Sequence, residues 1–122
     1  MKINEAEELD RVLTNLQNCS DIEGAAVITR NGILIKSTFP QDIDGQKFAA
    51  MAASMVGASE TAAALIKSFA KRIIIEIERG KILALGAGPK AILVVSVDER
   101  ADSEKLAQEL EKHKKDIMKI FK

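Results

Sequence analysis

Apolar residues recur every three to four positions in three stretches of the chain, and this spacing predicts three helices. The first covers about residues 6–16. The second runs from about residue 45 to residue 68, directly after Asp44, a residue suited to cap a helix N-terminus. The third begins at Asp102 or Ser103 and continues to about Phe121.

Shorter apolar runs separated by turn residues predict five strands. Two of these runs flank Asn31-Gly32, at about residues 24–30 and 33–37, which predicts a hairpin with a type I′ turn and positive φ at both central residues. Three more strands are predicted after the second helix, with tight turns at Arg79-Gly80 and Gly88-Pro89. Their expected bounds are about residues 72–79, 81–87 and 91–97.

The predicted order is α-β-β-α-β-β-β-α, and it indicates one α+β domain over residues 1–122. We expect a profilin-like sandwich with a five-stranded, mainly antiparallel sheet. The central helix should cover one face of this sheet, and the two terminal helices should share the other face.

The central helix contains the least polar stretch of the chain, with no charged residue between Phe48 and Ser59. On a helical wheel the bulky side chains gather on one side: Phe48, Met51, Met55, Ile66 and Phe69. The opposite side is small: Ala49, Ala50, Ala53, Gly57 and Ala64. We expect the bulky side to pack on the sheet and the small side to contact another chain.

The small side has a second interpretation, because alanine favours helix formation and an alanine-rich face can be buried within its own chain. An exposed helix face normally carries charges, as both terminal helices do. The lack of charge therefore favours an interface with a partner.

Composition and charge narrow the function classes. Lys and Arg balance Asp and Glu at 18 each, and Trp and Tyr are absent, so neither a basic surface nor a platform for base stacking is expected. The sequence predicts no nucleic-acid binding, no membrane span and no secretory signal. With a single cysteine and no expected disulfide, it favours a cytoplasmic protein.

Three features of the sequence could suggest cofactor binding or catalysis, but a structural role is the better interpretation of each. Residues 86–91 match a loosened dinucleotide-binding pattern, but a strand follows where that motif needs a helix, so a hairpin turn is expected. His113 lies on an apolar helix stripe, and Cys19 has no neighbouring cation that would activate it. No catalytic residue, metal site or cofactor is predicted.

The third predicted strand carries Glu76 and Glu78 on one side. Two carboxylates could hold a metal, but charges on an exposed strand more often protect a sheet edge. In a third interpretation, the strand pairs with its own copy about a two-fold axis near Ile74. Arg72 of one chain would then face Glu76 of the other.

Three segments together resemble the Roadblock family of dynein light-chain-type proteins: GAAVITRNGILIKS, DGQKFAAMAASM and IIIEIERGKILALGAGPKAILVV. The resemblance covers about residues 6–121. It implies the fold derived above, in a stand-alone prokaryotic, archaeal-like member. These patterns of small, apolar and turn residues identify a fold family well and an activity poorly.

The resemblance implies a homodimer, or a heterodimer with a related chain, in which the central helices pack together and the third strands join the two sheets. The implied dimer contacts are Ala49, Ala53, Gly57, Glu60, Arg72, Ile74 and Glu76. It further implies a non-enzymatic regulator or scaffold that binds a small Ras-like GTPase, acting without an arginine finger if it activates the GTPase. The alternative function is a small-molecule sensor with a pocket between the sheet and the central helix.

Overall fold

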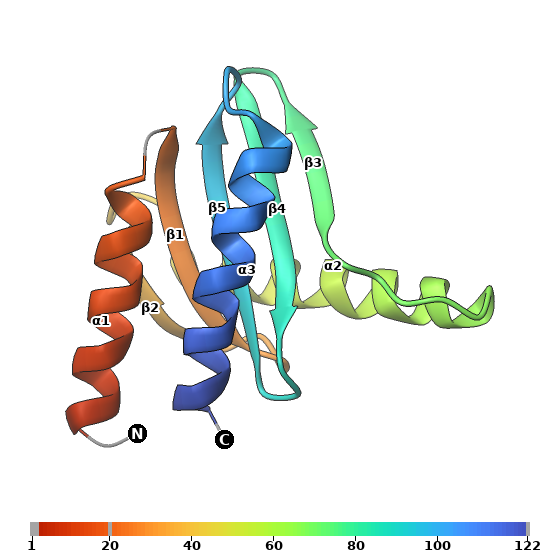
Figure 1. Ribbon diagram of the computed structural model, residues 1–122, viewed down its shortest axis with the longest axis horizontal. Helices are drawn as coiled ribbons and strands as arrows, with labels where there is room; N and C mark the ends of the chain where they lie inside the picture. Colours follow the sequence, from red (N-terminus) through yellow and green to blue (C-terminus); the bar gives the residue numbers. More distant parts are fainter. Residues whose placement is uncertain (1–2, 20, 122) are drawn as a thin grey trace.

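The computed structural model describes residues 3–19 and 21–121, with eight elements in the predicted order (Figure 1). The helices are α1 (Ile3–Gln17), α2 (Gly45–Leu65) and α3 (Ser103–Ile120). The strands are β1 (Ile22–Thr29), β2 (Leu34–Ser37), β3 (Ile73–Ile77), β4 (Gly80–Ala87) and β5 (Ala91–Asp98). The predicted caps are confirmed, because Asp44 accepts from the Lys47 amide and Asp102 caps α3.

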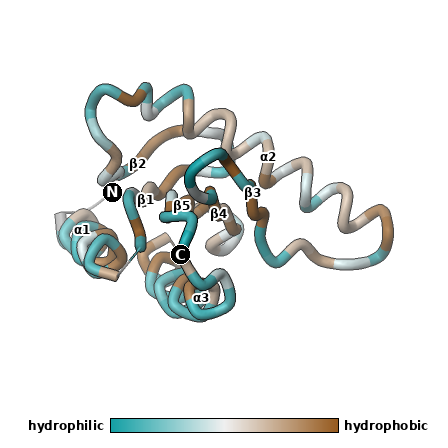
Figure 2. Tube along the Cα trace, turned by 90° about the horizontal axis from the view of Figure 1, so that it is seen from above, coloured by the Kyte–Doolittle hydropathy of each residue, from teal (hydrophilic) through white to brown (hydrophobic). Residues whose placement is uncertain are grey.

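All five strands form one sheet in the order β2-β1-β5-β4-β3, and every neighbouring pair is antiparallel. The α+β sandwich is therefore confirmed, and β2 and β3 are its edge strands. Helix α2 crosses one face of the sheet, while α1 and α3 lie side by side on the other (Figures 1 and 2).

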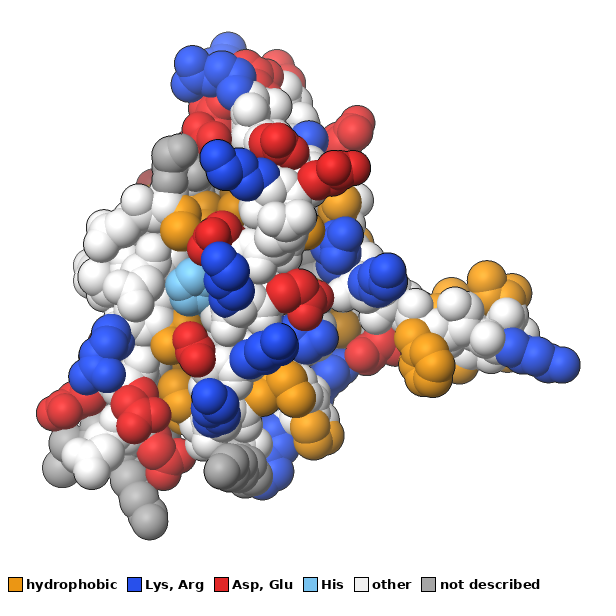
Figure 3. Space-filling view, in the orientation of Figure 1, with side chains coloured by type: hydrophobic (Ala, Val, Ile, Leu, Met, Phe, Trp, Pro, Cys, Tyr) orange, Lys and Arg blue, Asp and Glu red, His pale blue; other side chains and the backbone are white. Residues whose placement is uncertain are grey.

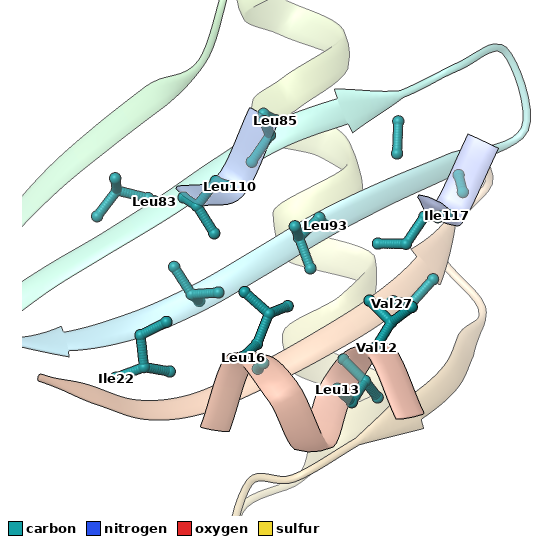
Figure 4. Close-up of a cluster of buried hydrophobic side chains, with 14 of the residues drawn as sticks. Val12, Leu13, Leu16, Ile22, Val27, Leu83, Leu85, Leu93, Leu110 and Ile117 are labelled. Carbon is teal, nitrogen blue, oxygen red and sulfur yellow. The ribbon is translucent and has the colours of Figure 1, made fainter. Parts of the chain in front are cut away.

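The face under α1 and α3 holds the larger of two hydrophobic cores. Leu16 of α1 and Leu110 and Ile117 of α3 are fully buried against apolar residues of β1, β4 and β5, such as Leu93 (Figure 4). Both helices present one apolar stripe to the sheet and a charged side to solvent, as the sequence predicts.

The face under α2 holds a thinner core of smaller side chains. Its helix side consists of Ala49, Ala52, Ala53 and Val56, and its sheet side is Ala26, Ile28, Ala84, Ile92 and Val94. Phe39 and Phe48 pack against the margin of this core, with their ring centroids 5.3 Å apart.

The β1–β2 turn differs from the predicted type I′ turn. Of its residues only Gly32 has positive φ, at 88°, and the Gly32 amide donates to the Thr29 carbonyl. Arg30 and Asn31 occupy the central positions of an ordinary turn, and the register shifts between Val27 and Ile28. A three-residue loop with glycine at its positive-φ position is compatible with the twist of the two strands. Asn31 therefore does not need a positive φ.

Helix α2 ends at Leu65, three residues before the predicted end. Lys67 has φ of 60°, the Lys67 amide donates to the Ala64 carbonyl, and the Ser68 amide donates to the Ala63 carbonyl. This is the Schellman pattern of helix termination, here with lysine at the left-handed position that glycine usually occupies. The sequence carries no glycine or proline that would mark this end.

Candidate functional site

Helix α2 contacts the sheet through its small residues, contrary to the prediction. Ala49 and Ala53 are buried together with Ala52 and Val56, whereas Met51 is 56% exposed. The predicted assignment is therefore wrong for Ala49, Ala53 and Met51, whereas Phe48 and Met55 pack against the margin of the α2-side core as predicted. Ala49 and Ala53 cannot provide the contacts with a second chain that the resemblance implied, because their own sheet covers them.

The physical reason lies in the sheet beneath the helix. Ala26 and Ala84 leave a shallow surface there, so α2 can lie close to the strands only where its own side chains are small. The β1–β2 hairpin adds a further close approach, because a Cβ on Gly32 would lie 3.1 Å from Cα of Ala50. Bulky residues on this side would hold the helix away from the sheet.

The opposite side of α2 faces away from the sheet, and we call it the α2 outer face. Its members are Met51, Ser54, Gly57, Ala58, Thr61 and Ala64, all of them exposed. None is charged, although the exposed sides of α1 and α3 carry many charges. A Cβ on Gly57 would meet no atom within 4 Å, so the middle of this face is open.

The last part of α2 and the residues that follow extend beyond the edge strand β3 (Figures 1 and 2). We call residues 61–69 the apolar arm. Leu65, Ile66 and Phe69 are 80%, 78% and 94% exposed, and Figure 3 shows hydrophobic side chains gathered on this projection. A folded chain in water rarely leaves three large apolar side chains this exposed without a partner.

Strand β3 lies next to the arm and has one unpaired edge. Ile73 pairs with Ala84 of the α2-side core, so Ile73, Ile75 and Ile77 face the side of α2. Ile74, which is 45% exposed, faces the α3 side, as do Glu76 and Arg72 by alternation. The free β3 edge therefore adjoins exposed apolar residues on both faces of the sheet.

The structure brings most of the predicted interface residues to one end of the molecule. Gly57, Ala64, Ile74 and Glu76 are exposed, and Ala50, Glu60 and Arg72 are half-buried. Sequence reasoning missed Leu65 and Ala58, which face outward, and it misplaced Met51, Ile66 and Phe69 on the sheet side. The length of α2 was the signal that could have found them. A helix of 21 residues spans about 30 Å, and its last part extends beyond the sheet (Figure 1).

Cys19 and His113 lie on the other face of the sheet and do not form a nucleophile-base pair. His113 Nδ1 is 2.8 Å from the Glu109 carbonyl oxygen, and the Cys19 thiol points to the Asn15 carbonyl. Burial, and secondly the charge of Glu109, raise the pKa of the Cys19 thiol, which makes it a poorer nucleophile. An open cleft of about 470 Å³ beside it is lined by charges of both signs, including Asp21, Arg100 and Lys105.

The alternative function predicted from the sequence needs a ligand pocket between the sheet and α2, and the structure leaves little space there. Ala49, Ala52 and Val56 are at most 2% exposed, and their neighbours on the sheet are also buried. By length and composition alone α2 could also cross a membrane, a test that core helices of water-soluble proteins pass as well. The absence of a membrane span stays a prediction.

Comparison with known proteins identifies the family. The model of the Roadblock/LC7 domain matches residues 8–96. The uncharacterized protein MJ0310 of Methanocaldococcus jannaschii is 37% identical over 95 residues, which cover 77% of this chain and 82% of the relative.

Solved structures show the same fold at lower identity. Myxococcus xanthus MglB is 24% identical with a TM-score of 0.88, covering 99% of this chain and 92% of that one. A structure described as MglB with tetrameric arrangement is 20% identical with a TM-score of 0.85, covering 98% and 91%.

The profilin of Schizosaccharomyces pombe, at 15% identity and a TM-score of 0.61, covers 84% of this chain and 87% of its own. This likeness confirms the profilin-like fold that the sequence predicted. The family match spans α2 and β3, the elements that carry the α2 outer face, the apolar arm and the free edge. The chain is thus a member of the Roadblock/LC7 domain family.

Proposed function

We propose that this chain is a non-enzymatic dimer that regulates or scaffolds a small Ras-like GTPase. The observation that carries the proposal is the largely apolar surface formed by the α2 outer face, the apolar arm and the free edge of β3, which includes the exposed side chains of Leu65, Ile66 and Phe69. The GTPase is proposed from family membership, since the Roadblock resemblance implies such a partner. The tetrameric arrangement described for one MglB structure supports self-association of this fold.

The dimer would bury what a single chain leaves exposed. Two copies related by a two-fold axis beside β3 would pair their edge strands into one sheet and bring both α2 helices to the same face. The arm of each chain would then reach the α2-side face of its partner, where Ile77 is 47% exposed. The ends of both α2 outer faces would remain available to a third protein.

The charges on β3 favour a particular alignment. The two-residue turn at Glu78 and Arg79 makes Ile77 and Gly80 a hydrogen-bonded pair, so the backbone polar groups of Ile74 and Glu76 point to the free edge. A two-fold axis at Ile74 places Arg72 opposite Glu76 of the partner. An axis at Glu76 is disfavoured because it places two copies of this glutamate opposite each other.

Charge exchange on β3 tests this alignment. Arg72→Glu and Glu76→Arg should each weaken the dimer, by about two- to fivefold in Kd, because each puts like charges opposite one another at two symmetric positions. The double variant should recover wild-type affinity, as measured by analytical ultracentrifugation. Recovery instead in Arg72→Glu combined with Glu78→Arg would move the two-fold axis to Ile75.

Binding to small GTPases tests the functional part. The purified dimer should retain a small Ras-like GTPase from its source cell, and the affinity should differ between the GDP state and a non-hydrolysable GTP state. A second measurement, GTP hydrolysis with and without the dimer, separates an activator from a scaffold. If no small GTPase from that cell binds at about 50 µM in either nucleotide state, which corresponds to about 6 kcal/mol, the GTPase proposal is wrong.

A further inference from the structure

The Arg30 side chain connects three separate parts of the fold. It leaves the β1–β2 turn and donates from Nε and Nη2 to the Gly88 carbonyl oxygen, at 3.2 and 2.7 Å. Its Nη1 donates to Oε1 of Glu60 in α2, at 2.5 Å. One guanidinium therefore joins the β1–β2 turn, the β4–β5 turn and the central helix.

The surroundings hold this guanidinium in one place. A Cβ on Gly86 would lie 2.3 Å from Nη2 of Arg30, so the space exists only because residue 86 has no side chain. The Arg30 amide also donates to the Lys90 carbonyl, at 3.3 Å. With its planar donors committed to the β4–β5 turn, Arg30 presents a fixed N–H group to the helix.

Glu60 marks the point where α2 leaves the sheet. Val56 is the last buried residue of the helix, and every residue from Thr61 to Phe69 is exposed except Ala63, which is half-buried. Within residues 3–19 and 21–121, Glu60 makes the one side-chain hydrogen bond or ion pair that joins the second half of α2 to the rest of the chain. In the part of the chain that the structure describes, the arm beyond it makes no side-chain hydrogen bond or ion pair with the sheet or the other helices.

We propose that Arg30 is a positioning residue for the dimer interface, which it serves by fixing the direction in which the apolar arm leaves the sheet. This inference rests on the proposed dimer. From Glu60 to Leu65 the helix rises by about 8 Å, so a tilt of about 15° would move the arm by about 2 Å. A shift of this size separates packed side chains, because well-packed interfaces match protein interiors in density.

This role also reassigns Glu60. The resemblance implied that Glu60 contacts the partner, but Arg30 of its own chain binds its carboxylate. Its influence on the dimer is therefore indirect and passes through the orientation of α2. Charge alone does not replace Arg30, because lysine lacks the planar fork that donates to Gly88 and Glu60 together.

The experiment measures arm geometry and affinity separately. Spin labels at Ser68→Cys, in a Cys19→Ser background, report the distance between the two arms of a dimer. Arg30→Met and Glu60→Gln are compared with Lys36→Met, which breaks the Lys36–Asp10 ion pair, 2.9 Å long, at a site on the α1 side of the molecule. Circular dichroism establishes that each variant is folded, and Glu60→Gln keeps the test available if Arg30→Met does not fold.

Arg30→Met should broaden the distance distribution and raise the dimer Kd by about tenfold, whereas Lys36→Met should change neither. Glu60→Gln should have an intermediate effect, because an amide oxygen still accepts a hydrogen bond but carries no charge. An unchanged distribution and Kd in both Arg30→Met and Glu60→Gln would overturn the inference. A weaker dimer with an unchanged distance distribution would also overturn it, since Arg30 would then act by direct contact. A wild-type monomer would instead overturn the dimer itself.

Discussion

Replacing both Leu65 and Phe69 with glutamate should convert the dimer into a folded monomer. The two side chains are 80% and 94% exposed in the single chain, so their replacement removes no contact with the chain's own core. In the proposed dimer they are buried against the partner. The double variant would place four carboxylates in a desolvated interface, where an unpaired charge is very unfavourable.

The expected effect is large because four apolar side chains are involved. Burying each Leu or Phe contributes about 1.5–3 kcal/mol, so even partial burial in the dimer gives more than about 4 kcal/mol, or a thousandfold in Kd. Light scattering after gel filtration should give the mass of one chain for the variant and two for the wild type. The melting curve of the monomer should still show one cooperative transition.

Ile33→Glu is the matched control. Ile33 is also a large exposed apolar residue, at 52%, but it lies on the β1–β2 hairpin, away from the arm. This variant should stay dimeric. A wild-type chain that elutes as a monomer at about 100 µM, corresponding to less than about 6 kcal/mol of association free energy, would show that the apolar arm does not mark a self-interface.

Replacing Ala53 with glutamate should abolish folding, although the sequence alone places Ala53 in contact with a second chain. Ala53 is 9% exposed and packs against the sheet with Ala49 and Val56. A carboxylate there loses its water and gains no partner, at a cost of several kcal/mol. A domain of this size has a total stability of about 5–15 kcal/mol, so the folded state should be lost or nearly lost.

Ala58→Glu is the comparison, because it makes the same chemical change on the exposed side of the same helix. It should fold with a wild-type circular dichroism spectrum and weaken only the dimer. Thermal melting of both variants distinguishes the two sides of α2. A folded Ala53→Glu monomer with the wild-type melting temperature would mean that the small residues do face the partner, as the sequence first indicated.

Most of the fold could be predicted because its signals are local. The stripe of Leu9, Val12, Leu13 and Leu16 requires a helix resting on an apolar surface, and each becomes almost fully buried. Asp44 and Asp102 mark helix starts because a short acidic side chain can accept from the first free amides. The turn between β4 and β5 follows from Gly88, whose φ of 79° strains other residues.

The ends of elements were predicted less well. Helix α2 stops at Leu65 through a left-handed Lys67, a residue type that carries no stop signal. The turn at Asn31-Gly32 takes a longer form, in which Arg30 is directed toward Gly88 and Glu60. The helix end is held by local hydrogen bonds of the Lys67 and Ser68 amides, whereas the turn lies beside a contact between residues far apart in the chain.

The candidate site was predicted as a region and misread in detail. Gly57, Ala64, Ile74 and Glu76 are accessible near the free edge, in keeping with the predicted interface. Ala49 and Ala53 are instead buried between α2 and the sheet. A helical wheel separates large from small side chains, but it does not show which side of the helix packs on the sheet. That choice depends on the size of the sheet side chains beneath the helix.

The amino-acid sequence by itself determined the order of the elements, the three-layered sandwich and the uncharged stretch from Phe48 to Ser59 of α2, because periodicity, capping and turn residues act within a few positions of each other. Only the tertiary structure decided which side of α2 is buried, and where α2 leaves the sheet. Ala26 and Ala84, far from α2 in the sequence, make a shallow surface that admits only the small side of the helix. Close packing between distant segments therefore placed the apolar arm in solvent.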